Sequence, residues 1–225
     1  MSGLHVIILA IIQGLTEFLP VSSSAHLELW HKFVGETDDD LALDIAVHLG
    51  TLGAVILYFW KDVKLAMRGF LNLLRWQLTE PGVHLALCLI IATIPVVIIG
   101  LILRITGLYD LVRSLAVMGW AMIGFGILLW WADRNPKEIR TASQWTMKDA
   151  VKLGLWQALA LIPGTSRAGI TITGGLFAGY GREGAARIAM LMSIPTILAS
   201  GAILSLDVIG TANWELARLS LMAAG

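Results

Sequence analysis

The stretch LPVSSS at residues 19–24 interrupts an apolar segment that runs from Leu4 to Trp30. A second polar stretch, PGTSRAG at residues 163–169, interrupts the apolar segment Val151–Tyr180 in the same way. Each interruption contains a proline and leaves two half-helices of roughly 12 residues, which reach the middle of a bilayer and no further. The sequence therefore predicts two re-entrant helical hairpins, at residues 4–30 and 151–180.

The composition around these segments is that of a membrane protein. Apolar residues make up 57% of the chain and charged residues only 14%, and the mean hydropathy is +0.78. A soluble domain carries about 25% charged residues. The formal net charge is zero, which gives no electrostatic case for binding nucleic acid. The expected fold is an all-α polytopic membrane protein.

Four further stretches have about the length and apolarity of a membrane-spanning helix: residues 41–60, 84–103, 114–132 and 188–206. The intervening segments 61–82 and 133–149 are interpreted as loops, and they hold more basic residues than segments 31–40 and 104–113. The positive-inside rule places these two basic loops in the cytoplasm. Five glycines in or near the spans are interpreted as positions where helices pack closely: Gly50, Gly53, Gly119, Gly124 and Gly126.

The two interrupted segments resemble each other, which predicts an inverted repeat. Three expected spans lie between them, and an odd number inverts the second copy, so the hairpins enter from opposite faces. Repeat 1 covers about residues 1–132 and repeat 2 about residues 151–225. Residues 216–225 begin a further span and stop, from which we expect that the C-terminal helices are missing. Inverted repeats with broken helices place a binding site between the repeats.

The first interruption carries a candidate catalytic cluster. Gln13 and Glu17 are four residues apart, on one helix face, and a carboxylate in an apolar helix needs a cavity, a partner or a metal. Ser22 and Ser23 begin the second half-helix, where free N–H groups bind anions, and His26 lies one turn beyond Ser23. A hydroxyl beside a histidine suits nucleophilic catalysis. The structural alternative is a serine cap with a hydrogen-bonded histidine.

The second interruption carries a candidate phosphate site. Thr165, Ser166 and Arg167 stand at the hairpin turn, where a cation requires an anionic partner or water, and Arg binds phosphate through two parallel hydrogen bonds. The structural alternative is a pair between Arg167 and Glu17. If the turns meet, they can bind a diphosphate and transfer a phosphoryl group, with Glu17 sharing a divalent cation. His48 is a weaker candidate because a lone histidine within a span is as often a packing residue.

At these residues the chain resembles the undecaprenyl-diphosphate phosphatase family linked to bacitracin resistance. QGLTEFLPVSSSAH at 13–26 is similar to the family's first motif and PGTSRAGIT at 163–171 to its second. The similarity extends through Arg182 and the sequence SIP at 193–195, and the family's last span is absent here. Ala168 stands where the family usually has serine, so one hydroxyl beside Arg167 is lost while Ser166 and Thr171 remain.

The resemblance implies a bacterial plasma-membrane enzyme with its site open to the outer, periplasmic side. It would hydrolyse undecaprenyl diphosphate, a polyprenyl diphosphate lipid, and a divalent cation, Mg²⁺ or Ca²⁺, would support activity. Glu17 would be the metal or acid–base carboxylate. Ser23 and His26 would be the nucleophile and its partner, in an order that stays open. The phosphate-binding residues would be Arg167, Ser22, Ser166, Thr165, Gln13 and Thr171.

Two other functions compete with hydrolysis. A transporter or flippase for polyprenyl phosphate lipids would use the same inverted repeat, because fold does not fix function. It needs anion binding but no nucleophile, so the cluster of Ser23, His26 and Glu17 favours the enzyme. A passive structural membrane protein leaves Glu17 and Arg167 unexplained. The oligomeric state stays open between a monomer and a homodimer.

Overall fold

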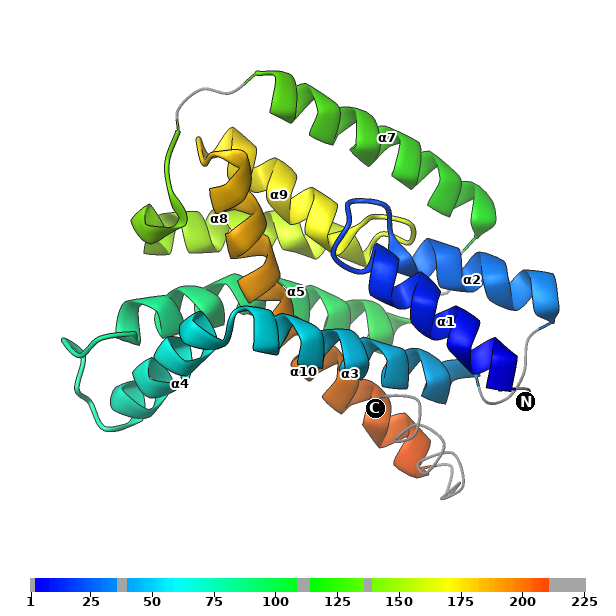
Figure 1. Cartoon of the computed structure of the whole chain (residues 1–225), viewed down its shortest axis with the longest axis horizontal. Coiled ribbons are helices and arrows are strands. Elements are labelled where there is room, and N and C mark those ends of the chain that lie inside the picture. Colours follow the sequence, from blue (N-terminus) through cyan, green and yellow to red (C-terminus); the bar gives the residue numbers. More distant parts are fainter. Residues whose placement is uncertain (1–2, 36–39, 109–113, 136–138, 211–225) are drawn as a thin grey trace.

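The protein is helical throughout the part that its computed structural model describes, which is residues 3–35, 40–108, 114–135 and 139–210 (Figure 1). In those residues the only β-type pairing is an isolated bridge between Arg140 and Tyr180. The all-α prediction is therefore confirmed. The expected partial span 216–225 lies outside the described residues.

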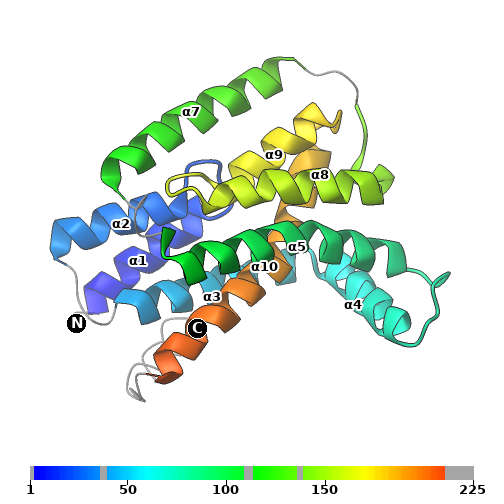
Figure 2. The ribbon, with the colours of Figure 1, turned by 180° about the vertical axis from the view of Figure 1, so that it is seen from behind.

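The first interrupted segment is a pair of helices, α1 (Gly3–Thr16) and α2 (Ser23–Val34), joined by a turn. Pro20 lies in this turn and lacks the N–H that a continuing helix needs. Ser22 has φ 61°, a left-handed conformation that also breaks the helix. At the other end of the pair, Trp30 Nε1–H donates to His5 Nδ1 over 3.3 Å. The two helices thus form a hairpin, and they lie side by side in both views (Figures 1 and 2).

The second interrupted segment has the same organisation, with α8 (Met147–Ala158), a 3₁₀ turn (Leu159–Leu161) and α9 (Arg167–Phe177). Ser166 caps α9, because its side chain accepts a hydrogen bond from the N–H of Gly169 over 3.1 Å. Short helices separated by proline and hydroxyl residues are therefore the shared local structure of both segments.

A polar cluster holds together the two ends of the second segment. Tyr180 Oη–H donates to Asp149 Oδ2 over 2.8 Å, and Arg140 donates to the same oxygen over 2.7 Å. Burial raises the pKa of the Asp149 carboxyl, but hydrogen bonds from Arg140, Thr146 and Tyr180 outweigh burial and hold that pKa well below its usual range. Asp149 lies near the start of α8 and Tyr180 just after the end of α9, so α8 and α9 form a second hairpin whose two ends are held together.

Three described helices are long and apolar enough to cross a membrane: Val83–Thr106 in α5 (Val83–Thr106), Leu115–Arg134 in α7 (Leu115–Arg134) and Arg182–Ala202 in α10 (Arg182–Gly210). They overlap three of the four spans expected from the sequence. The multi-pass membrane architecture is therefore supported by the fold.

The fourth expected span, 41–60, differs from the prediction. Helix α3 (Asp40–Tyr58) ends at a sharp bend, and α4 (Trp60–Leu74) leaves it at 93°, so the pair counts as one span only if it is a broken one. The interpretation of 61–82 as a loop was wrong, because most of this segment is α4. Its basic residues lie on one side of a helix, and sequence charge alone does not distinguish that from a loop.

The prediction about close-packing glycines was also wrong for four of the five. A Cβ added to Gly53, Gly119, Gly124 or Gly126 would meet no atom within 4 Å. The close approach occurs instead at Gly154, where an added Cβ would lie 2.6 Å from the Ala92 carbonyl oxygen, between α8 and α5.

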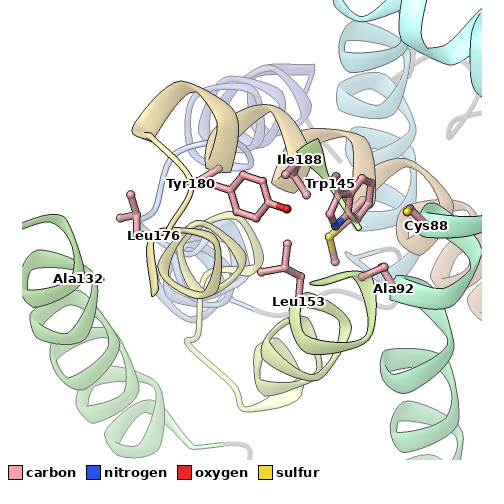
Figure 3. Packing of buried hydrophobic residues seen from close by; sticks show 11 residues of the cluster. Cys88, Ala92, Ala132, Trp145, Leu153, Leu176, Tyr180 and Ile188 are labelled. Atoms are coloured by element: carbon pink, nitrogen blue, oxygen red, sulfur yellow. The ribbon is translucent and has the colours of Figure 1, made fainter. Parts of the chain in front are cut away.

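The main hydrophobic core fixes the second hairpin against α5 and α10. Leu153 of α8 is fully buried and belongs to one cluster with Cys88, Tyr180 and Ile188. Figure 3 shows Leu153, Tyr180 and Ile188 gathered around a common centre, with Cys88 on the neighbouring α5. The second hairpin, which carries Arg167, is therefore held in position by a close-packed hydrophobic core.

Candidate active site

The turns of the two hairpins touch each other. A Cβ added to Gly169 would lie 3.1 Å from Pro20 Cβ, so the start of α9 is in contact with the turn between α1 and α2. Ser166 Oγ–H also donates to the carbonyl oxygen of Leu19 over 3.2 Å. Both views show the turns next to each other (Figures 1 and 2). Segments 147 residues apart in the chain are thereby joined into one site.

Glu17 lies at the centre of this site and is 7% exposed. Ser23 Oγ–H donates to Glu17 Oε2 over 2.6 Å, and Gln13 Nε2–H donates to the same oxygen over 2.9 Å. Gln13 Nε2 also lies 3.5 Å from Thr51 Oγ1 on α3. Through this short bond the Ser23 hydroxyl points its proton at the Glu17 carboxylate, which is the arrangement that a nucleophile and a base require.

Two side chains that can carry positive charge flank the carboxylate. Arg167 Nη2 is 4.0 Å from Glu17 Oε1, and His48 Nε2 is 3.6 Å from Glu17 Oε2. The other ring nitrogen of His48 lies 2.6 Å from the carbonyl oxygen of Asp44, which only accepts hydrogen bonds, so Nδ1 carries a proton. At 4.0 Å, Arg167 does not form a close pair with Glu17, and its guanidinium retains donors for another anion.

His26 occupies a position different from that of its neighbour Ser23. Its Nδ1 lies 2.8 Å from the carbonyl oxygen of Ser22 and therefore donates to it. Ser22 Oγ is 3.3 Å from Ser24 Oγ. In the described structure the hydroxyl of Ser23 thus has Glu17 as its acceptor, while Nδ1 of His26 is engaged with the backbone one turn earlier.

Several buried polar atoms at the turns have no hydrogen-bond partner within the described part of the chain: Gln13 Oε1, Thr165 Oγ1, Arg167 Nη1 and Thr171 Oγ1. Buried polar groups are normally satisfied, so a cluster of unsatisfied ones indicates a place for a polar ligand or for water. The donors among them suit an anion with several oxygens.

A cavity of about 320 Å³ opens beside Arg167. Its polar lining includes His48, Ser24 and Ser200, and its apolar lining includes Leu27 and Ile197. A second cavity, of about 180 Å³, touches Ser22 and Ser166 and lies against α7. Polar groups at the turns and apolar walls around them suit a ligand with a charged head and a hydrocarbon tail.

The residues of this site can bind a metal ion only if a bound ligand supplies part of its coordination. The described residues contain no group of three His, Cys, Asp or Glu side chains placed to bind one ion. Among the described residues, both hydrogen bonds to Glu17 go to Oε2, and Oε1 faces Arg167 across 4.0 Å. Mg²⁺ and Ca²⁺ take oxygen ligands, and Mg²⁺ is often bound by one or two carboxylates together with substrate phosphates. The donor set fits that mode and not an all-protein cage.

Direct contacts join Gln13, Ser23 and Arg167 to Glu17, and Ser166 contacts the first turn. Three other residues proposed from the sequence are buried on the same two hairpins: Ser22, Thr165 and Thr171. Sequence reasoning missed Thr51 and ranked His48 low, although both reach this cluster from α3. The available signal was the spacing in the expected span 41–60. Thr51 lies four residues after Val47 and His48 four residues after Asp44, so the two residues of each pair share one helical face. Arg182, through which the family resemblance extends, lies outside this cluster: it donates to Asp133, and its side chain is 78% exposed.

Comparison with known proteins identifies the family of the chain. The model of the family described as bacitracin resistance protein BacA matches residues 6–224. The undecaprenyl-diphosphatase of Roseobacter denitrificans is 60% identical over 224 residues, which are all of this chain and 84% of that protein. Those of Jannaschia sp. and Saccharophagus degradans are 55% and 46% identical, and they cover 100% and 96% of this chain and 84% and 81% of their own length. The chain therefore belongs to the bacitracin resistance protein BacA family.

Proposed function

We propose that this chain is an undecaprenyl-diphosphatase, a multi-pass membrane hydrolase that converts undecaprenyl diphosphate into undecaprenyl phosphate and inorganic phosphate. The observation that carries the proposal is the contact between the two hairpin turns, which brings Ser23, Glu17 and Arg167 into one place. The names and identities of the relatives support it. Such an enzyme recycles the lipid carrier for cell-wall synthesis and thereby confers resistance to bacitracin.

Ser23 is the nucleophile and Glu17 its base. The Oγ atom attacks the terminal phosphorus, and the bond between that phosphorus and the bridging oxygen breaks. The hydroxyl proton goes to Glu17 Oε2, which already accepts the hydrogen bond over 2.6 Å. Undecaprenyl phosphate leaves and takes that proton from Glu17. The carboxylate then accepts a proton from water, whose oxygen attacks the phosphoserine phosphorus. The bond from phosphorus to Ser23 Oγ breaks, the proton passes from Glu17 to Oγ, and inorganic phosphate is released. General base catalysis of this kind contributes about 10²–10⁴ in rate.

Arg167 and the hydroxyl groups bind the diphosphate. Phosphoryl transfer depends mainly on positioning and on stabilisation of charge, and Arg offers two parallel donors to phosphate oxygens. Arg167 Nη1, Thr165 Oγ1 and Thr171 Oγ1 are the buried groups that need partners. The first turn of α9 adds backbone N–H donors and the positive end of the helix dipole. Ser22 borders the same cavity as Ser166 and adds a further hydroxyl.

A divalent cation, Mg²⁺ or Ca²⁺, fits between Glu17 and the substrate. Glu17 would be its protein ligand, and phosphate oxygens and water would supply the rest of its coordination. Bound there, it would neutralise charge on the diphosphate.

Both hairpins are re-entrant in this proposal and belong to an inverted repeat. The first has its ends joined near His5 and Trp30, and the second has its ends joined near Asp149 and Tyr180. Because their turns meet, the two sets of ends point away from each other, which suits entry from opposite faces of the plasma membrane. We infer from the basic residues around α4 that the second set of ends faces the cytoplasm, in which case the first hairpin opens to the outer side.

Every group invoked in the reaction belongs to one chain, so a monomer is sufficient for the chemistry, whether or not the protein forms a homodimer. Transport of polyprenyl phosphate lipids remains the competing function. It would use Arg167 but would not need the hydrogen bond from Ser23 to Glu17.

Release of inorganic phosphate from undecaprenyl diphosphate in detergent tests the proposal. We expect Arg167→Ala to lower the rate on the order of 10³-fold or more, since Arg that stabilises a transferring phosphoryl group has effects of that size. Ser23→Ala should be comparably impaired, and His26→Ala less so. The matched control is Thr146→Ala, which removes a hydroxyl that caps the start of α8, at the end of the second hairpin opposite its turn.

Labelling of the terminal phosphate distinguishes the nucleophile. After acid quenching, we expect an acid-stable phosphoserine that disappears in Ser23→Ala. An acid-labile label that survives Ser23→Ala would assign the nucleophile to His26 instead. Hydrolysis at the wild-type rate in all three site variants would exclude this active site.

A further inference from the structure

Helix α4 carries a row of basic side chains on one side. The row consists of Lys61, Lys64, Arg68 and, at the end of the helix, Arg75, and all four are exposed. At 3.6 residues per turn these positions fall within an arc of about 60°. Four like charges in so narrow an arc repel one another unless negative charge or water lies beside them.

An exposed apolar stripe runs directly beside the basic row. Trp60 is 55% exposed, Met67 57%, Leu71 46% and Leu74 64%. With Phe70 these residues occupy an arc of about 100° that adjoins the basic arc. A stripe of this size facing water would be costly, and in a membrane protein it is expected where the helix meets lipid.

The opposite side of α4 is fixed to the rest of the protein. Gly69 is buried, and a Cβ there would collide with the backbone of Gly82, so α4 lies directly on the start of α5. Asp62 accepts two hydrogen bonds from Arg187 Nη2 over 2.7 and 2.8 Å, which ties α4 to α10. The exposed stripes therefore have a defined direction and do not result from a freely rotating helix.

The position of α4 is that of a helix lying along the membrane surface. It leaves α3 at 93° and touches the first residues of α5 and the first turns of α10, both of which are membrane-spanning helices (Figure 1). Helix α4 thus lies beside the starts of α5 and α10, and it does not continue the direction of α3. A helix with an apolar stripe and a basic row in this position lies in the interface between headgroups and acyl chains.

We propose that α4 is an interfacial helix that binds anionic glycerophospholipids of the adjoining leaflet. The apolar stripe enters the acyl boundary, and Lys61, Lys64, Arg68 and Arg75 meet the lipid phosphates. Charge complementarity selects the anionic lipid, because a basic residue near an anionic surface contributes attraction that a zwitterionic surface lacks. The proposal concerns a surface away from Glu17 and does not depend on the hydrolytic reaction.

Photo-crosslinking of the full chain in vesicles tests the choice of lipid. Photoreactive phosphatidylglycerol and photoreactive phosphatidylcholine are supplied at equal amounts, and adducts on α4 peptides are counted by mass spectrometry. We expect phosphatidylglycerol to be favoured in the wild type. The preference should fall roughly 30-fold in Lys64→Gln/Arg68→Gln, since each of the two basic residues contributes on the order of 1 kcal/mol.

The matched control is Lys148→Gln/Lys152→Gln, which removes two exposed basic side chains one turn apart on α8. It should leave the adducts on α4 unchanged. Equal crosslinking of the two lipids in the wild type, or an equal fall in both double variants, would overturn the proposal.

The depth of α4 is measured independently of the lipid headgroup. A nitroxide at Met67→Cys, in a Cys88→Ser background, should be accessible to oxygen and protected from a water-soluble nickel complex in vesicles that contain phosphatidylglycerol. Full access of the nickel complex would place the stripe in water and would equally overturn the proposal.

Discussion

The change Ser166→Ala tests how the two hairpins are joined, because one hydroxyl performs two tasks. Ser166 Oγ accepts from the N–H of Gly169 over 3.1 Å and donates to the carbonyl of Leu19 over 3.2 Å. Loss of a serine cap costs about 1 kcal/mol, and loss of a hydrogen bond costs about another 1 kcal/mol. We therefore expect Ser166→Ala to lower the free energy of unfolding by about 2 kcal/mol.

Activity in the folded protein should fall as well as stability. Arg167 follows the cap directly, so loosening of this turn displaces its guanidinium from the diphosphate, and we expect kcat/KM to fall about tenfold, or roughly 1.4 kcal/mol. Phosphate release and thermal unfolding in detergent are measured on the same samples. Ser166→Thr keeps a hydroxyl that can make both bonds and should restore activity.

The control Thr146→Ala removes a hydroxyl that also makes two bonds, because Thr146 Oγ1 accepts from the N–H of Asp149 over 3.2 Å and donates to Asp149 Oδ2 over 2.7 Å at the start of α8. It should cost about 2 kcal/mol of stability and leave kcat/KM unchanged. Equal loss of activity in the two alanine variants, or full activity in Ser166→Ala, would refute the reasoning about the turn.

Three further changes follow from the structure. Glu17→Gln keeps the size of the side chain but removes the base, so phosphate release should fall about 10²–10⁴-fold while the protein remains folded. Asp149→Asn should lower the free energy of unfolding at neutral pH by about 2 kcal/mol, measured by thermal unfolding. Its control, the exposed Asp133→Asn, should lower it by less than about 1 kcal/mol. Because folding lowers the pKa of Asp149, its contribution to the free energy of unfolding is complete above about pH 4 and disappears only in stronger acid. A stability difference between the wild type and Asp149→Asn that grows from pH 6 to 8 would contradict this. Gly154→Ala should destabilise by about 1–3 kcal/mol because an added Cβ would meet the Ala92 carbonyl at 2.6 Å, whereas Gly124→Ala should not destabilise.

The two hairpins were predictable because their signals are local. Pro20 and Pro163 cannot continue a helix, and Ser166 caps the next one, so the breaks follow from covalent chemistry and from short-range hydrogen bonds. The pairing of Gln13 with Glu17 follows equally from helical spacing. These features depend on residues a few positions apart, and sequence reasoning identifies them without knowledge of the fold.

The remaining features depend on tertiary contacts. Helix α4 was interpreted as a loop because its basic residues indicate a membrane side and say nothing about backbone conformation. What fixes the helix is contact with Gly82 and Arg187, which are distant in sequence. The approach of His48 to Glu17 likewise depends on how α3 packs against the first hairpin. No periodicity in the sequence specifies such a distance.

Formation of a disulfide between Pro20→Cys and Gly169→Cys, in a Cys88→Ser background, tests most directly whether the hairpin turns meet. Gly169 would place a Cβ 3.1 Å from Pro20 Cβ, close to the separation of about 3.5–4.5 Å that a disulfide requires. On mild oxidation in membranes, the account predicts nearly complete intramolecular crosslinking, detected by intact mass, with none in either single-cysteine variant. Two free thiols that react with a maleimide but never with each other would contradict the contact on which the active site depends.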